Sequence, residues 1–71
     1  MLIPGKLYKT KYFIIFNADA TNLVDIGDII LFIKYIPYTK QSFLKRMYCF
    51  HENKILHRIV GDEHVKWFDA I

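Results

Sequence analysis

The apolar run Ile29–Ile36 constrains the fold more than any other segment of this 71-residue chain. Side chains alternate between the two faces of a strand, so the odd positions form one wholly apolar face and the even positions a second, interrupted only by Lys34. A chain this short cannot build a sheet with a covering layer on each side. We therefore expect the odd residues to fill the core and an exposed surface to carry the even ones, Ile30, Phe32 and Ile36.

The remainder of the chain predicts an all-β fold. Runs of four to ten residues rich in Ile, Tyr, Phe, Val and Leu alternate with turn residues such as Gly27-Asp28 and Gly61-Asp62. No apolar pattern of helical spacing extends over three turns. Residues 7–16 predict a first strand whose even positions form one mostly apolar face. Residues 65–71 predict a short last strand, after at most one helical turn with Asp62 as its N-cap.

Residues 43–60 predict a β-hairpin with Glu52-Asn53 at its turn. Asn53 suits a left-handed backbone conformation. The expected register places Phe50 opposite Ile55, with two further pairs along the hairpin, Tyr48 with His57 and Arg46 with Ile59. Both faces of this hairpin mix polar and apolar residues, so the pattern leaves open which face is buried.

About five antiparallel strands in one domain, residues 1–71, favour a small closed barrel. Cys49 is the single cysteine, so no disulfide within the chain can stabilise the domain. A flat open sheet would leave its edges and one apolar face in water. Closure into a barrel buries one set of alternate residues and removes most of the edge.

The segment Leu23-Val24-Asp25-Ile26-Gly27-Asp28-Ile29-Ile30-Leu31-Phe32 resembles SH3-like small barrels, in which Leu-x-x-Gly-Asp-x-Ile/Leu ends the first long loop. The resemblance implies that Gly27-Asp28 forms a turn and that the apolar residues after it enter the core. The peptide-binding SH3 signatures, Ala-Leu-Tyr-Asp-Tyr, tandem Trp and Pro-x-x-Tyr, are missing, so recognition of proline-rich peptides is not implied. In composition the chain also resembles small bacteriophage proteins, which implies the host cytoplasm or a virion as its location.

Four potential zinc ligands, Cys49, His51, His57 and His64, lie close together in the sequence. Cys-x-His on a strand places two ligands on one face. The predicted hairpin register, however, places His57 on the opposite face. We interpret the group as a buried thiol and scattered surface histidines, and we expect no metal and no other cofactor.

Catalytic motifs are also missing. Cys49 and His51 are two residues apart on a strand, about 7 Å, too far for a nucleophile and its base. Asp25 and Asp28 could form a carboxylate pair, but we interpret them as turn residues that bond the local backbone. No phosphate-binding glycine loop or hydrolase motif is present. We expect neither enzymatic activity nor a small-molecule substrate.

Composition favours a protein-binding function. The chain is 54% hydrophobic and 17% aromatic, more than a small interior holds, so part of the excess is expected on a surface that a partner or a second copy covers. The candidate interface residues are Ile30, Phe32, Ile36, Tyr38, Trp67 and Phe68, although Trp67 equally suits the core.

The alternative is single-stranded nucleic-acid binding, because small barrels combine aromatic platforms with basic rims. A net charge of +3 makes this the second choice. Its candidate residues are Lys9, Lys11, Tyr12, Lys34, Lys45, Arg46 and Tyr48. We expect no membrane contact and a cytoplasmic protein, because the apolar runs are too short to span a bilayer and residues 1–5 do not resemble a signal peptide.

Overall fold

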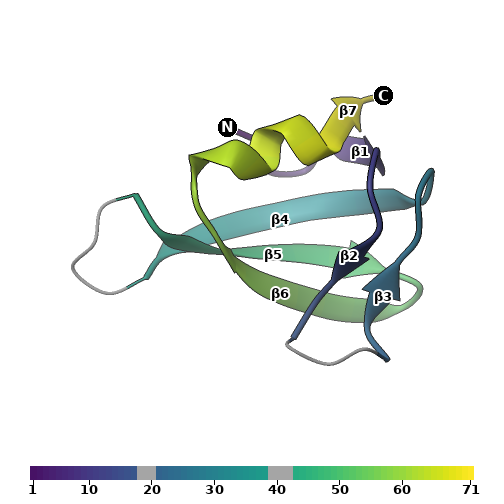
Figure 1. Cartoon of the computed structure of the whole chain (residues 1–71), viewed down its shortest axis with the longest axis horizontal. Coiled ribbons are helices and arrows are strands. Elements are labelled where there is room, and N and C mark those ends of the chain that lie inside the picture. Colours follow the sequence, from purple (N-terminus) through teal and green to yellow (C-terminus); the bar gives the residue numbers. More distant parts are fainter. Residues whose placement is uncertain (18–20, 39–42) are drawn as a thin grey trace.

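The nine-residue strand β4 (Ile29–Pro37) lies in the middle of a five-stranded antiparallel sheet in this computed structural model, which describes residues 1–17, 21–38 and 43–71. The strand order is β6-β5-β4-β1-β7, and two short strands, β2 and β3, form a separate pair. In Figure 1 β2 and β3 pass in front of the sheet and a 3₁₀ helix, η1, runs along one side of it. The other elements are β1 (Leu7–Thr10), β2 (Ile14–Ile15), β3 (Leu23–Val24), β5 (Lys45–His51), β6 (Lys54–Val60), η1 (Asp62–Trp67) and β7 (Phe68–Ala70).

The predicted all-β class, with about five antiparallel strands and one helical turn near the C-terminus, is confirmed. Among the described strands the hydrogen-bonded ladder ends at β6 and at β7, so the sheet does not close into a barrel. The helical turn precedes the last strand as expected. Its N-cap is Gly61, however, without a side-chain hydrogen bond, and Asp62 is the first helical residue.

The register of the β5–β6 hairpin is the predicted one. Phe50 pairs with Ile55, Tyr48 with His57, and Arg46 with Ile59. Asn53 has the expected positive φ of 65°, and Glu52 shares it with a φ of 49°. The structure also settles which face is buried: the residues that enter the core are Met47, Cys49, Leu56 and Val60.

The inward face of β4 is opposite to the one predicted. Ile30 and Phe32 are completely buried, whereas Ile29 is 52% exposed. The register against β5 shifts between Phe32 and Lys34, which makes Ile33 the extra residue of a β-bulge. After the bulge the alternation is reversed, so Tyr35 packs against the core and Ile36 points outward.

The first predicted strand is broken into two pieces. β1 ends at Thr10 and β2 begins at Ile14, and the residues between them do not continue the ladder. Of the even positions that form the predicted apolar face, Tyr8, Thr10, Ile14 and Phe16 are buried. Tyr12 is the exception, with 57% of its surface exposed, because it lies in the break.

Residues near the N-terminus are held across the end of the core by two tyrosine hydroxyls. The Leu2 N–H donates to the Tyr35 hydroxyl at 3.0 Å, and the Ile3 N–H donates to the Tyr8 hydroxyl at 2.8 Å. The Leu2 side chain is itself buried. The sheet, η1 and these first residues therefore enclose one core.

Candidate functional site: an exposed apolar face of the sheet

The sheet surface turned away from the core is mainly apolar, and we call it the outer face. One row of it crosses four strands in direct register: Leu7 pairs with Leu31, Leu31 with Phe50, and Phe50 with Ile55. Leu7 is 48% exposed, Phe50 38% and Ile55 61%. The residues of the outer face are Leu7, Lys9, Ile29, Leu31, Ile33, Lys34, Ile36, Arg46, Tyr48, Phe50, Ile55, His57, Ile59 and Asp69.

Basic side chains are interspersed among these apolar residues. Lys34 pairs with Tyr48 across β4 and β5, and its Nζ lies 5.7 Å from the centre of the Tyr48 ring. The Arg46 guanidinium donates to His57 Nδ1 at 2.9 Å. Since arginine can only donate, Nδ1 of His57 is the acceptor of this bond. A shallow depression of about 350 Å³ lies beside them, lined by Ile33, Lys34, Ile36, Tyr48 and Ile55.

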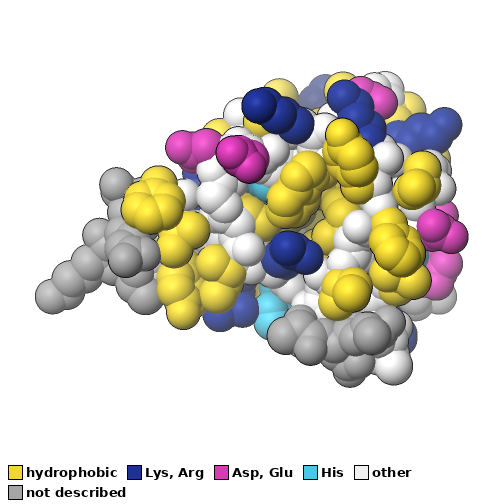
Figure 2. Space-filling model, in the orientation of Figure 1, with side chains coloured by type: hydrophobic (Ala, Val, Ile, Leu, Met, Phe, Trp, Pro, Cys, Tyr) yellow, Lys and Arg dark blue, Asp and Glu magenta, His cyan; other side chains and the backbone are white. Residues whose placement is uncertain are grey.

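A second apolar surface lies on the side of the molecule where β2, β3 and η1 lie. Figure 2 shows hydrophobic side chains gathered there around a hollow, with a basic side chain among them. A hollow of about 140 Å³ is lined by Tyr12, Phe13, Ile14, Arg58 and Trp67. The Arg58 guanidinium lies 5.2 Å from the centre of the Trp67 ring and donates to the Ile15 carbonyl at 2.9 Å. These bonds hold Arg58 in place as part of the wall.

The predicted interface residues are divided by the structure. Ile30, Phe32 and Phe68 are buried, so their prediction as surface residues is wrong. Before the bulge the even positions of β4 face the core, and Phe68 lies opposite the buried Thr10 in the β1–β7 register. Ile36 lies on the outer face and is 39% exposed. Tyr38 lies beside it under the Arg46 guanidinium, whose carbon is 5.9 Å from the ring centre. Trp67 is half-buried in the wall of the hollow, partly against the core.

Three of the predicted nucleic-acid residues, Lys34, Arg46 and Tyr48, come together on the outer face. The others are dispersed. Lys45 is 3.4 Å from Asp62 and lies over the Tyr35 ring. The remaining three are separated as well: Lys11 forms an ion pair with Asp69 at 3.2 Å, Lys9 lies opposite Asp69 in the β1–β7 register, and Tyr12 lines the hollow.

Sequence reasoning missed the row of Leu7, Leu31, Phe50 and Ile55. The hairpin register placed Phe50 and Ile55 together, but nothing indicated that their face is exposed. A signal that could have identified the buried face lies in the hairpin itself. On the face opposite the row, Met47, Cys49 and Leu56 form an apolar centre, and the charged Lys45 and Arg58 lie at the edge of that face.

A buried tyrosine–histidine pair lies inside the molecule. His64 is 1% exposed, and its ring meets the Tyr35 hydroxyl through Nε2 at 2.5 Å and the Gly61 carbonyl through Nδ1 at 2.6 Å. Because a carbonyl only accepts, Nδ1 carries the proton and Nε2 accepts from Tyr35. Burial lowers the pKa of His64, as the nearby Lys45 also does, against the raising effect of the Gly61 bond. Burial raises the pKa of Tyr35, so both groups stay neutral near pH 7.

The four potential zinc ligands of the sequence analysis do not converge among the described residues. Cys49 and His51 point inward, His57 lies on the outer face, and His64 is bound to Tyr35. Burial raises the pKa of the Cys49 thiol to about 12, which keeps the sulfur protonated and unreactive.

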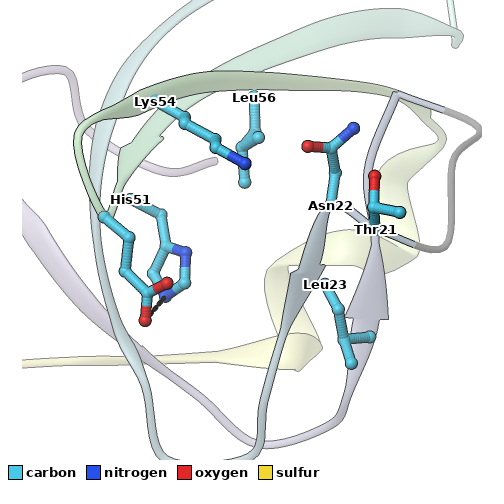
Figure 3. A pocket seen from close by; sticks show the side chains of 7 residues that line it. Thr21, Asn22, Leu23, His51, Lys54 and Leu56 are labelled. Atoms are coloured by element: carbon cyan, nitrogen blue, oxygen red, sulfur yellow. Dashed lines mark ion pairs between the residues drawn. The ribbon is translucent and has the colours of Figure 1, made fainter.

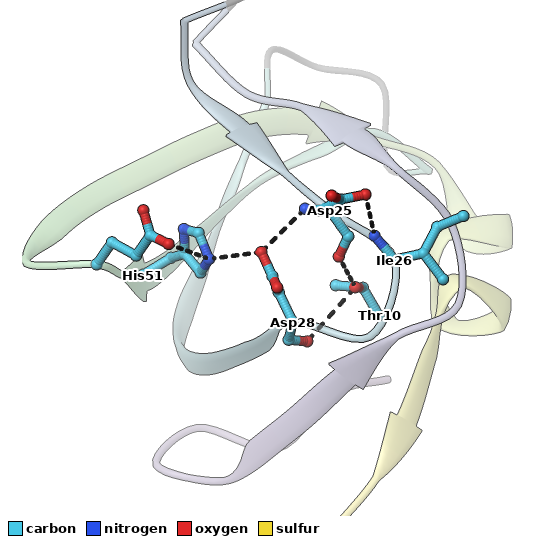
Figure 4. Close-up of polar contacts among 6 residues, drawn as sticks. Thr10, Asp25, Ile26, Asp28 and His51 are labelled. Carbon is cyan, nitrogen blue, oxygen red and sulfur yellow. Dashed lines mark hydrogen bonds and ion pairs between the residues drawn. The ribbon is translucent and has the colours of Figure 1, made fainter.

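A different group, Asp28, His51 and Glu52, has its ligand atoms within 4.8 Å of one another, alone among the residues that the structure describes. Figure 4 shows that Asp28 contacts both His51 and the backbone at Asp25. Asp28 Oδ2 accepts from the Asp25 N–H at 3.0 Å and lies 3.1 Å from His51 Nε2. Gly27 has the positive φ of 87° that the turn requires, so Asp25 and Asp28 are the turn residues that the sequence predicts.

A small hollow lies next to His51, between the β5–β6 turn and residues 21–23. Figure 3 shows His51, Lys54 and Leu56 on one side of it and Asn22 and Leu23 on the other. Its volume is about 30 Å³, enough for a water molecule and too small for an organic ligand.

Comparison with protein-family models, with curated proteins and with solved structures found no match to this chain. Within the described part of the chain, no helix has the length and apolar character needed to cross a membrane. The geometry of the outer face is therefore the main basis for a functional proposal.

Proposed function

We propose that this chain is a non-enzymatic protein-interaction module that docks through its outer face, either on a larger protein or on a second copy of itself. The observation that carries the proposal is the exposed row Leu7, Leu31, Phe50 and Ile55, which crosses four strands in register. Four apolar side chains in contact across a sheet form a continuous patch rather than scattered exposure, and such patches mark interaction sites.

The energetics favour covering this patch. Complete burial of one Leu, Ile or Phe side chain contributes about 1.5–3 kcal/mol relative to full exposure. Leu7, Phe50 and Ile55 already have roughly half of their surface covered. Covering the rest of these three residues would thus contribute about 2–4 kcal/mol. The neighbouring Ile36 and Ile59, both on the outer face and partly exposed, would add to this.

The SH3-like resemblance belongs to the same proposal. The order β6-β5-β4-β1-β7 and the 3₁₀ helix directly before the last strand support it, as does the Gly27-Asp28 turn that leads into β4. The compositional resemblance to small phage proteins suggests an accessory or host-interacting factor, in the host cytoplasm or the virion, as the biological setting. The outer face offers such a factor a rigid docking surface.

A matched pair of substitutions tests the use of the outer face. Ile55→Ser removes an apolar side chain from the row, where it is 61% exposed; Ile26→Ser removes one from the β3–β4 turn, where it is 65% exposed. We expect the wild-type chain to sediment as an oligomer, or to bind an apolar dye as a monomer. Ile55→Ser should reduce that signal and Ile26→Ser should preserve it. A wild-type monomer that binds no dye would contradict the proposal.

Nucleic-acid binding is the second candidate, because Lys34, Arg46 and Tyr48 meet on the outer face. Backbone phosphates would contact the two cations, and a base would stack on the tyrosine. The test is fluorescence anisotropy with labelled single- and double-stranded oligonucleotides. Binding that weakens steeply with added salt would support this candidate. No anisotropy change at low salt would eliminate it.

A further inference from the structure

We propose that the partner of the outer face is an acidic amphipathic helix of another protein, with carboxylates beside its apolar stripe, rather than a second copy of this chain. The inference rests on the proposed function and specifies its partner. It follows from the charges of the outer face, from their positions and from the shape of the surface.

β4, β5 and β6, which make up most of the outer face, contain no aspartate or glutamate, and of their five basic residues Lys34 and Arg46 lie on this face. Asp69 lies on the edge strand β7, where it forms an ion pair with Lys11. Lys34 lies in the middle of the outer face next to Tyr48, and Arg46 lies toward the end that carries Ile36 and Ile59, where its guanidinium reaches His57. No carboxylate of the described residues lies within ion-pair distance of either cation, whereas Lys11 and Lys45 have such partners elsewhere.

Charge therefore disfavours self-association through the outer face. In a symmetric dimer the same surface of each copy meets its equivalent, so residues near the axis face their own counterparts. Lys34 and Arg46 would then approach the same cations of the second copy in a desolvated interface, where juxtaposed like charges are costly. A partner that brings carboxylates to this position converts the repulsion into ion pairs.

The shape of the outer face fits a helix. A row across four strands is about 14 Å wide, and a helix with its side chains is about 10–12 Å wide. Outward residues on one strand are about 7 Å apart, close to the 6 Å rise between positions i and i+4 of a helix. The depression beside Ile33, Ile36 and Ile55 can receive one apolar side chain of such a stripe.

The same surface is less suited to nucleic acid. Base stacking needs open aromatic faces, but the Tyr48 ring has the Lys34 ammonium over it and the His57 ring beside it, with ring centres 5.8 Å apart. Most of the remaining outer-face residues are aliphatic: Leu7, Leu31, Ile33, Ile36, Ile55 and Ile59. Aliphatic side chains pack against an apolar helical stripe but provide no stacking platform.

The experiment is an NMR titration of the isotopically labelled chain with two model helical peptides. Both have about 18 residues and the same leucine stripe, flanked by glutamates in one and by lysines in the other. We expect the glutamate peptide to shift the amide signals of β4, β5 and β6, with an affinity that falls as salt is added. The lysine peptide should cause no comparable shift.

Charge-reversal variants locate the effect. Lys34→Glu combined with Arg46→Glu should weaken binding of the glutamate peptide by about tenfold or more. Lys66→Glu, on the exposed side of η1, alters the charge in the same sense away from the outer face and should change affinity by less than about twofold. Equal weakening by both variants would mean that net charge rather than the outer face is responsible, and would overturn the proposal.

The other outcomes separate this inference from the proposed function. Equal binding of both peptides at the outer face would keep the protein-binding function and overturn the acidic preference. Amide shifts of that face on dilution of the chain alone would show that the chain forms a dimer. This result would also keep the protein-binding function and overturn the preference for an acidic helix. If an oligothymidylate shifted the same amides and neither peptide did, both the acidic-helix proposal and the protein-binding function would be overturned. Both would also be overturned if no ligand caused a shift and the chain were a monomer that binds no dye.

Discussion

Replacing Tyr35 by phenylalanine tests the buried pair on which the end of the core depends. The change removes one oxygen and keeps the ring, which packs against Phe32 with centres 4.5 Å apart. That oxygen accepts from the Leu2 N–H and donates to His64 Nε2. Without it, the nitrogen acceptor of a fully buried imidazole has no donor, and the Leu2 N–H loses its acceptor.

A buried polar group left without a partner costs about 1–3 kcal/mol. A chain of this length has a free energy of unfolding of roughly 4–10 kcal/mol, so the Tyr35→Phe change removes a substantial part of it. The corresponding loss in melting temperature is about 5–20 °C. Thermal and urea unfolding followed by circular dichroism measure both quantities. Tyr12→Phe is the matched control, because its ring lies exposed in the break after β1.

The same pair gives the wild-type protein a defined pH dependence. Burial lowers the pKa of His64, so below about pH 6.5 the unfolded chain binds a proton that the folded chain excludes. The stability that neutral His64 contributes is complete above that pH and is lost as the pH falls, by at most about 1.4 kcal/mol per pH unit. In the Tyr35→Phe variant, neutral His64 Nε2 has already lost its hydrogen-bond donor, so the free energy of unfolding should fall less on acidification than in the wild type. The reasoning is refuted if Tyr35→Phe costs less than about 0.5 kcal/mol and leaves the pH dependence unchanged.

Three further predictions concern other buried or paired groups. The Cys49 thiol, with a pKa raised to about 12, should react with a thiol reagent only as fast as the protein unfolds; rapid labelling under native conditions would contradict its burial. Thr10→Val should lower the free energy of unfolding by about 1 kcal/mol in urea titration, because the hydroxyl donates to the Asp25 carbonyl at 2.7 Å. Asn17→Ala should lower the free energy of unfolding by about the same amount and increase aggregation, which light scattering measures. Asn17 Oδ1 accepts from the His57 N–H, and the Asn17 N–H donates to the His57 carbonyl, so the Asn17 side chain protects part of the edge strand β6.

The parts of the fold that the sequence predicted correctly depend on local pattern. Glu52-Asn53 specifies a two-residue turn, and the turn fixes the register of both flanking strands, so the β5–β6 pairs could be read from the residues. Gly27 and its neighbouring aspartates likewise specify a turn by their own backbone preferences. These features need no knowledge of the rest of the molecule.

The orientation of β4 could not be predicted, because both of its faces are apolar and periodicity then contains no information. The bulge at Ile33 is a change in the pairing of β4 with β5, and no glycine or proline lies next to it in either strand. For the same reason an exposed apolar surface was predicted, but of the three β4 residues assigned to it only Ile36 lies there. An exposed apolar sheet face exists, yet it carries Phe50 and Ile55 in place of Ile30 and Phe32.

The position of β1 in the sheet has a consequence for how the chain folds. β4, β5 and β6 are consecutive in sequence and can form a three-stranded meander through short-range contacts, which close quickly. β1 pairs with β4 on one side and with β7 on the other. The β1–β7 pairing joins residues that are about sixty positions apart in the sequence, such as Tyr8 and Ala70. Closing so long a loop is entropically costly and slow. During synthesis β7 emerges after β1 to β6, so until then Phe68 is not available to pack on Tyr8, and the nascent chain exposes this end of its core.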